Sequence, residues 1–339
     1  MANRNYNLTE VKTEASEFLN TKKKVNQTTY LNYRTSINYF IYYLEDITGT
    51  EVLGTENKEA VLEDFQASLL EGFIYKIEDP EKEVTVEKVV KVKPSTVNSH
   101  VRRIKTFLNR RLGLTVELKK LKVDKPKYKA LSKELVELLA NECSNKWKNK
   151  EIAVRNETLI RFLFNTAFRI EEALGITTDN LYKENGSYYV KIHEKGTAKG
   201  TLTEVVISEK SYNMLMDYIN IKSVPSDFVF SSIKASENGK AKAFNRQNFN
   251  KSIIELAFYV DSKYKGTKID NEEVNISKVV ENNSSHFLRH SKAIYLLNVK
   301  KEDIITVKEI LRHSSLDSTL IYLNPQEEAI NKVRVDNDI

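Results

Sequence analysis

The sequence contains one cysteine, no long apolar run and no strong excess of charge of one sign. Because Cys143 is the single cysteine, an internal disulfide and a metal site built from several thiolates are excluded, which fits a reducing compartment. No run of about 18 apolar residues occurs, and residues 1–13 lack the apolar core of a signal peptide. We therefore expect a cytoplasmic protein that does not span a membrane.

Size and charge set only broad limits on the class of protein. The 339 residues, 40% of them hydrophobic, can bury a sizeable core and favour two domains over one. Lys and Arg number 53 against 47 Asp and Glu, and the net charge of +6 favours an anionic partner without identifying it.

Apolar residues spaced by three and four predict two helices in the N-terminal region, over residues 28–44 and 95–110. Between them, in residues 76–93, valines alternate with charges after Pro80, which fits a protruding hairpin or a flexible insertion. The second helix also carries a polar stripe, whose hydroxyl and guanidinium groups suit phosphate oxygens or base edges of DNA. A solvated helix face would have the same composition. The stripe consists of Ser99, Arg103, Thr106 and Arg110.

Lysines crowd the segment that follows this helix. Residues 118–129 hold six lysines and Pro126, which makes a poor core element and a good tether. If the chain binds DNA, three of these lysines would neutralise backbone phosphates: Lys122, Lys125 and Lys127. The predicted division of the chain is a domain at 1–117, a linker at 118–130 and a second domain at 131–339.

The second domain is predicted to be mainly helical with a small β-sheet. Residues 159–174 have the pattern of an amphipathic helix that carries Arg169. Residues 188–193 and 202–207 are β-rich and are separated by a glycine-containing turn, which predicts a hairpin.

Three short segments near the C-terminus gather residues suited to attack on a phosphodiester. They are His-Phe-Leu-Arg-His at 286–290, Leu-Arg-His-Ser-Ser at 311–315, and Tyr322. Cleaving DNA without a metal requires a nucleophile, fixed cations for the phosphate oxygens, and groups that move two protons. Tyrosine suits a reaction whose product is used again, because phosphotyrosine keeps the energy of the broken ester. Arginine binds phosphate through two hydrogen bonds, and lysine or histidine exchanges protons near neutral pH. Each residue alone is better explained by packing or solvation, so the hypothesis depends on their combination.

These segments, together with residues 166–176, resemble the tyrosine recombinases, also called the phage integrase family. Residues 166–176 read Thr-Ala-Phe-Arg-Ile-Glu-Glu-Ala-Leu-Gly-Ile and are similar to the family's first arginine box, Thr-Gly-x-Arg-x-x-Glu-Leu-x-x-Leu. Residues 286–290 match its His-x-Leu-Arg-His box. Residues 311–322 resemble its Leu-Gly-His-Ser-Ser and Thr-x-x-Tyr pattern, with the same order and spacing. Weaker similarity to the family's core-binding domain extends over residues 28–44 and 94–110.

The resemblance implies a role for each matching residue. Tyr322 is the nucleophile that forms a 3′-phosphotyrosyl link and frees a 5′-hydroxyl, while Arg169 and Arg289 hold the scissile phosphate. His286 exchanges the proton of the tyrosine, and His313 donates a hydrogen bond to a phosphate oxygen.

Two further roles come from the same resemblance. Lys195, on the turn between the predicted strands, protonates the leaving 5′-oxygen, with Lys199 as the rival for that role. Glu172 supports the active-site residues without reacting.

Four positions depart from the family pattern without removing a reacting group. Ala167 and Arg312 each replace a glycine, Ser285 stands where proline is common, and Asn324 stands where histidine often follows the tyrosine. Arg312 lies beside His313, so it either contacts the phosphate itself or disturbs the end of the helix.

The family resemblance also implies the fold, the partners and the reaction. We expect a helical core-binding (SAM-like) domain and a mainly helical catalytic domain that close as a C-shaped clamp on double-stranded DNA with an inverted-repeat core site. The implied assembly is a homotetramer on two DNA sites, with accessory DNA-bending proteins as further partners and without a metal or other cofactor. Strands would be exchanged through a Holliday junction for integration, excision or resolution of a mobile element or replicon. A type IB topoisomerase, a telomere resolvase and a catalytically silent DNA-binding accessory protein are the alternatives.

Overall fold

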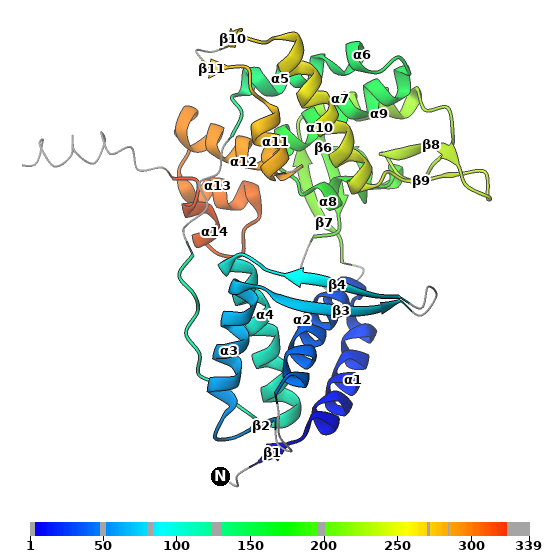
Figure 1. Cartoon of the computed structure of the whole chain (residues 1–339). Coiled ribbons are helices and arrows are strands. Elements are labelled where there is room, and N and C mark those ends of the chain that lie inside the picture. The colour runs from blue at the N-terminus through cyan, green and yellow to red at the C-terminus, as the bar shows by residue number, and fades with distance from the viewer. Residues whose placement is uncertain are drawn as a thin grey trace, which may run out of the picture. The chain divides into compact units, whose positions relative to one another are not determined.

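A computed structural model of the chain describes residues 4–47, 52–79, 84–123, 130–194, 201–269, 272–283 and 285–323. The chain divides into two compact units, Met1–Lys125 and Pro126–Ile339. Helices dominate both units, and the strands form small antiparallel sheets (Figure 1). The mainly helical fold with small sheets is therefore confirmed, whereas the roles assigned to the two domains stay predictions.

In the described part of the first unit, local sequence signals mark the starts of several helices. Asn7 and Glu10 form a capping box at the first helix, with Asn7 Oδ1 accepting from the Glu10 amide and Glu10 Oε2 accepting from the Asn7 amide. Asn26 caps the second helix, and Pro94 opens the fourth, where a missing N–H costs nothing. The elements are β1 (Asn5–Tyr6), α1 (Leu8–Val25), α2 (Gln27–Glu45), β2 (Leu53–Gly54), α3 (Lys58–Glu71), α4 (Pro94–Phe107) and the π-turn η1 (Leu108–Leu112).

The core of the first unit lies where α2, α3 and α4 meet. Phe40 of α2 and Phe65 of α3 are fully buried and pack edge to face, with ring centroids 5.1 Å apart. Ile104 and Phe107 of α4 are also fully buried. Burial of each such side chain contributes about 2 kcal/mol, so the apolar face of α4 is firmly held and its other faces are left for polar side chains.

The segment predicted as a hairpin or a flexible insertion is a hairpin. Strands β3 (Phe73–Asp79) and β4 (Val84–Val90) pair antiparallel, with Phe73 opposite Val90. Tyr39 of α2 packs on Phe73 and Tyr75, at centroid distances of 5.9 and 5.2 Å. These aromatic contacts fix the hairpin to α2.

The second unit surrounds helix α7 and contains a three-stranded sheet in the order β5-β6-β7. Tyr188 pairs with Ile207 across β6 and β7, which confirms the hairpin predicted at 188–193 and 202–207. The helices are α5 (Lys133–Asn141), α6 (Cys143–Lys146), α7 (Lys150–Thr166), α8 (Ile170–Leu174), η2 (Thr178–Asn180), α9 (Glu209–Asn220), α10 (Arg246–Lys263), α11 (Ser277–Asn283), α12 (His286–Ile294), η3 (Tyr295–Val299), α13 (Ile304–Leu311) and α14 (Asp317–Leu320). The strands are β5 (Leu181–Glu184), β6 (Ser187–Ile192), β7 (Thr203–Ile207), β8 (Ser231–Ala235), β9 (Ala241–Ala243), β10 (Lys268–Ile269) and β11 (Glu272–Glu273).

Two apolar clusters stabilise the second unit. The larger one includes Phe162 of α7 and Phe287 of α12, both fully buried. A smaller cluster joins Ala167, Leu311 and Tyr322, so it brings together the C-terminal ends of α7 and α13 and the segment after α14. Within the described part of the chain, no helix has the length and apolar character needed to cross a membrane.

Candidate active site

A pocket of about 440 Å³ in the second unit is lined by residues from the segments that the sequence analysis singled out. Five of the six predicted catalytic residues lie around it: Arg169, His286, Arg289, His313 and Tyr322. His290, Asp317, Ser318 and Ile321 complete the lining. The sixth predicted residue, Lys195, and its rival Lys199 lie outside the described residues.

Arg289 is held by the ends of two helices. Only 4% of the residue is exposed, and its guanidinium donates to the carbonyl oxygens of Ala167 at 2.6 Å and of Leu311. These carbonyls lie at the C-terminal ends of α7 and α13, where helices carry unpaired acceptors and partial negative charge. Burial, followed by the charge of Arg169, lowers the pKa of Arg289 to about 10, so the guanidinium stays charged at neutral pH. The result is a cation fixed at the wall of the pocket.

Arg169 is fixed by the carboxylate of Glu172. Arg169 is the N-cap of α8, where its amide donates to Glu172 Oε2 and its Nη1 donates to Oε1, both at 2.8 Å. The arginine side chain is 24% exposed, whereas that of Glu172 is 3% exposed. Burial alone would raise the pKa of Glu172, but the charges of Arg312 and Arg169 and their hydrogen bonds outweigh it and lower the pKa. Glu172 is therefore a permanent anion behind the pocket.

Arg312 turns to the same carboxylate. Its Nη2 donates to Glu172 Oε2 at 2.5 Å, its Nε lies 3.6 Å from Glu194 Oε1, and its guanidinium lies over the ring of Phe168 at 4.5 Å. Arg312 is not among the described residues that line the pocket. Of the two alternatives raised by the sequence, phosphate contact stays a prediction, and the helix end forms with the Arg312 side chain turned to Glu172.

The two residues that stand where the family has glycine share an unusual backbone conformation. Ala167 has φ 54° and ψ 24°, and Arg312 has φ 51° and ψ 50°, so both lie in the left-handed region at the C-terminal end of a helix. A side chain in this region costs about 1–2 kcal/mol, which is why glycine is favoured there. The turns nevertheless form, and the α13 turn is closed by the Arg312 amide donating to the Glu309 carbonyl at 2.9 Å.

Tyr322 is 4% exposed, and its hydroxyl is hydrogen-bonded to His290, with 2.7 Å between Oη and Nδ1. Burial, followed by the charges of His286 and Arg289, lowers the pKa of His290 to about 4. In the neutral tautomer whose proton is on Nε2, Nδ1 is the acceptor and the phenol donates to it. The family resemblance implies proton exchange by His286, which is exposed at the start of α12 and lines the same pocket. The signal for His290 was its place four residues after His286, on the same side of the helix.

His313 is oriented by Thr319. Its Nδ1 lies 2.8 Å from the hydroxyl oxygen of Thr319, which is fully buried. Burial, followed by the charges of Arg289 and Arg169, lowers the pKa of His313 to about 4, so the ring is neutral at pH 7. When the Thr319 hydroxyl donates to Nδ1, the ring proton is on Nε2, and this N–H is then available to an anion in the pocket.

The predicted DNA-binding residues of the first unit differ in their hydrogen bonds and exposure. The Ser99 hydroxyl donates to the carbonyl of Ser95 at 3.1 Å, and the Thr106 hydroxyl donates to the carbonyl of Arg102 at 2.9 Å, both within α4. Arg103 donates to Ser36 of α2 at 3.2 Å, and burial, followed by the charge of Arg102, lowers its pKa. Arg110 and Lys122 are exposed, and Lys125 and Lys127 lie outside the described residues. The DNA contacts of this set stay predictions.

No group of three or more His, Cys, Asp or Glu side chains in the described ranges is arranged to hold a metal ion. The absence of a cofactor stays an expectation.

Residues 129–329 match the phage integrase family, and the chain therefore belongs to this family. The tyrosine recombinase XerH of Campylobacter jejuni is 27% identical over 173 residues, covering 51% of this chain and 42% of that protein. The tyrosine recombinase XerC of Neisseria gonorrhoeae is 28% identical over 171 residues, 50% of this chain and 47% of its own length. The chain thus spans about half the length of the curated relatives it matches.

Solved structures show the same fold over most of the chain. XerH bound to a palindromic difH substrate in a post-cleavage complex has a TM-score of 0.62 at 16% identity, covering 94% of this chain and 82% of that one. The Tn1549 transposon integrase in complex with transposon right end DNA has a TM-score of 0.63 at 14% identity, covering 97% and 99%. These likenesses confirm the predicted recombinase fold class.

Proposed function

We propose that this protein is a site-specific DNA recombinase that cuts and rejoins duplex DNA through Tyr322. The observation that carries the proposal is the single pocket that joins Tyr322 to Arg169 and Arg289, residues from three distant parts of the chain. Both guanidiniums are already fixed, Arg289 by helix carbonyls and Arg169 by Glu172. Such preorganised cations stabilise charge that develops on a phosphate without rearranging during the reaction.

In the proposed cleavage step, one bond to phosphorus forms as another breaks, and two protons are transferred. The phenolic oxygen of Tyr322 forms a bond to the scissile phosphorus as the bond to the 5′-oxygen breaks. His290 takes the phenol proton, supported by the 2.7 Å hydrogen bond, and His286 is the other base in reach of the pocket. Lys195 gives a proton to the leaving 5′-oxygen. A 5′-hydroxyl from another strand reverses these steps, which rejoins the DNA.

The wider scheme follows from family membership. We propose an inverted-repeat core site, four protomers on two DNA sites and a Holliday junction intermediate, with accessory DNA-bending proteins in some reactions. The solved XerH and Tn1549 integrase structures are complexes with DNA, and this chain shares their fold. Integration, excision and resolution of a mobile element or replicon all use the same chemistry, so the pocket does not distinguish among them.

A nicked suicide substrate tests this function. The nick lets a short 5′-hydroxyl strand diffuse away after cleavage, so the covalent protein–DNA complex accumulates and is counted on a denaturing gel. Tyr322→Phe should bind the same DNA but form no covalent complex. Tyr295→Phe is the matched control, since Tyr295 packs against the same apolar cluster, and it should cleave at the normal rate. Covalent complex in the Tyr322→Phe variant would refute the proposal.

The nicked substrate, together with a supercoiled plasmid and a linear duplex, separates the alternatives. A type IB topoisomerase would relax supercoiled plasmid without a specific site, and a telomere resolvase would leave hairpin ends. An accessory DNA-binding protein would form no covalent complex on any substrate. Site-dependent cleavage followed by joining to a second duplex supports the recombinase.

A further inference from the structure

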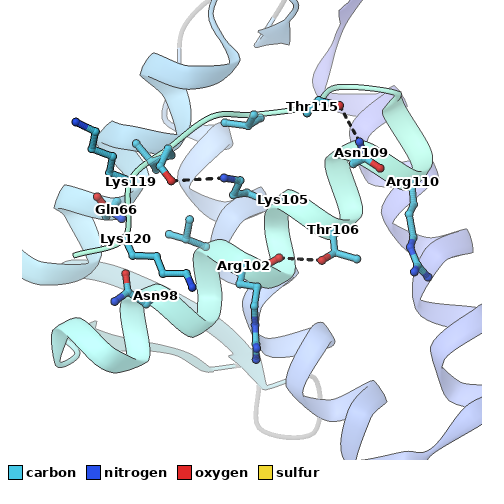
Figure 2. A pocket seen from close by; sticks show the side chains of 13 residues that line it. Gln66, Asn98, Arg102, Lys105, Thr106, Asn109, Arg110, Thr115, Lys119 and Lys120 are labelled. Carbon is cyan, nitrogen blue, oxygen red and sulfur yellow. Dashed lines mark hydrogen bonds between the residues drawn. The ribbon is translucent and has the colours of Figure 1, made fainter. Parts of the chain in front are cut away.

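The first unit contains a second pocket, of about 460 Å³, between α4, α3 and the segment that follows η1 (Figure 2). Its size is within the range of about 300–1,000 Å³ typical of small-molecule sites. Three apolar side chains form part of its lining: Val101, Val116 and Leu118. The polar lining residues are Gln66, Asn98, Arg102, Lys105, Thr106, Asn109, Arg110, Thr115, Lys119 and Lys120.

Hydrogen bonds hold residues 113–121 against α4 and so fix the walls of this pocket. Asn98 pairs with Leu121 in both directions, with Nδ2 donating to the carbonyl at 3.0 Å and the amide donating to Oδ1 at 2.9 Å. Asn109 Nδ2 donates to Thr115 Oγ1 at 2.8 Å, as Figure 2 shows. The pocket is therefore a built feature of the unit rather than a gap beside a loose segment.

The charge of this pocket has one sign. Of the described residues that line it, Arg102, Lys105, Arg110, Lys119 and Lys120 are cationic and none is acidic. Four of them, Arg102, Arg110, Lys119 and Lys120, are exposed and are called the rim cations here, whereas Val101 and Val116 are buried. The half-buried Lys105 donates to the Leu118 carbonyl at 3.5 Å. An apolar floor beneath a cationic rim fits a ligand with an apolar body and an anionic group.

Gln66 adds a buried amide group to the lining. The residue is 7% exposed, and its Nε2 finds no hydrogen-bond partner among the described residues. A buried amide donor without an acceptor destabilises the folded protein, and an oxygen acceptor entering the pocket would remove this cost. Gln66 lies on α3 and lines the same pocket as the cations (Figure 2).

We propose that this pocket binds a small organic anion, whose oxyanion meets the rim cations and whose apolar body rests on Val101 and Val116. The phosphates of a DNA backbone are the other source of the same oxyanion chemistry. The apolar floor and the buried Gln66 amide favour the discrete ligand, since a backbone phosphate remains solvated and has no apolar part to bury.

Titration of the whole protein with 8-anilinonaphthalene-1-sulfonate, a fluorescent apolar anion, tests the pocket. One saturable site is expected. Reversing two exposed rim charges, Arg102→Glu with Lys120→Glu, should weaken binding about tenfold or more. Gln66→Leu keeps the size of the side chain, should fold normally, and should also weaken binding. Lys93→Glu, an exposed cation at the start of the same helix that does not line the pocket, should change affinity less than about twofold.

Three results would overturn the proposal. The first is that the probe shows no saturable site. The second is that the probe affinity is unchanged in both the Arg102→Glu/Lys120→Glu and the Gln66→Leu variants. The third is that the charge-reversed variant loses as much affinity for a random DNA duplex as it loses for the probe. The last result would assign the rim to a DNA backbone.

A second inference concerns Arg312 and rests on the proposed function. One carboxylate, Glu172, binds both Arg169 and Arg312, at 2.8 and 2.5 Å. The Arg312 guanidinium donates to Glu172 Oε2, the same oxygen that accepts from the Arg169 amide. We propose that Arg312 is a positioning residue, which sets the place of the Arg169 guanidinium at the pocket without contacting DNA.

Arg312→Gly tests this role, because glycine suits the left-handed turn and the helix end should therefore survive. Single-turnover cleavage at saturating DNA should fall about tenfold while DNA affinity is unchanged, and Arg312→Lys should recover part of the rate. The defect should persist on a substrate with a 5′-bridging sulfur, whose thiolate leaves without needing a proton.

A normal rate in Arg312→Gly, or full rescue by the sulfur substrate, would overturn this inference. Failure of the wild-type protein to cleave would instead contradict the proposed function.

Discussion

The two pockets hold their cations in opposite ways. In the second unit, Arg289 and Arg169 are bonded to helix carbonyls and to a buried carboxylate before any ligand is present. In the first unit, Arg102, Arg110 and Lys120 are exposed around an apolar floor. Fixed cations in a partly dry site suit catalysis, because they need not reorganise as charge develops. Exposed cations suit the attraction and binding of anions, and salt weakens these interactions by screening.

The largest effect should come from loosening the most firmly held cation. Arg289→Lys keeps the charge, but one ammonium cannot span the Ala167 and Leu311 carbonyls as the planar guanidinium does. Cleavage should fall about 10²–10³-fold, measured as the single-turnover rate of covalent complex formation. Arg161→Lys, on the surface of α7, is the control and should stay near the wild-type rate. A rate within about threefold of wild type for Arg289→Lys would show that the fixed geometry is unimportant.

Removing the buried anion should chiefly cost stability. Glu172→Gln leaves Arg169 and Arg312 side by side without the charge that joins them, and breaking a buried pair costs about 3 kcal/mol. Urea unfolding of the second unit should report this loss. Glu171→Gln is the matched control, since Glu171 is exposed and pairs with Arg246 at 3.4 Å. This variant should lower the free energy of unfolding by less than about 1 kcal/mol. Equal effects of the two variants would argue that the buried carboxylate is not special.

Acid should weaken both units through their neutral histidines. Burial lowers the pKa of His290 and His313 in the second unit, and of His100 in the first, to about 4. In the unfolded chain a histidine titrates near 6.5, so between about pH 6.5 and 4 the unfolded state binds more protons. The free energy of unfolding contributed by these groups is thus present above pH ~6.5 and is lost as the pH falls through this window.

Two variants assign that pH dependence to one unit at a time. His290→Gln should flatten the pH profile of urea unfolding for the second unit, and His100→Gln should flatten it for the first. An unchanged slope in either variant would contradict the assignment of that histidine as neutral in the folded state.

The smallest effect should come from a single exposed cation. Lys122→Ala removes one predicted phosphate contact, so DNA affinity should fall slightly and the dependence of log K on log salt should lose about one unit of slope. Cleavage at saturating DNA should be unchanged. Lys240→Ala, an exposed lysine paired with Asp227, serves as the control. A cleavage defect for Lys122→Ala would mean that exposed cations also act in the chemistry.

The family resemblance predicted residues that line the candidate active-site pocket, because each matching segment places a few side chains on one short element. Arg169, Arg289, His313 and Tyr322 all line it. The partners of those residues were harder to foresee. The bonds from Arg289 to the ends of α7 and α13 depend on tertiary packing, which no local pattern encodes.

The same limit explains His290 and Arg312. The sequence showed that His290 shares a helix face with His286, but which of the two reaches the phenol depends on how α12 packs beside α14. Arg312 replaces a glycine, and the sequence could not reveal that its side chain turns to Glu172, a residue far away along the chain. For residues 76–93 a hairpin was one of two alternatives. The observed hairpin has strands at 73–79 and 84–90, and it is anchored by aromatic contacts with Tyr39, which lies on a helix earlier in the chain.

The lone cysteine gives the molecule a built-in reporter of opening. Cys143 is fully buried, and burial raises the pKa of its thiol, so alkylating reagents should meet neither an accessible sulfur nor a thiolate in the native state. A fluorophore can therefore be attached to a cysteine introduced on the surface while Cys143 remains unlabelled. In the unmodified protein, the rate at which Cys143 is alkylated then measures how often the helices around α6 move apart.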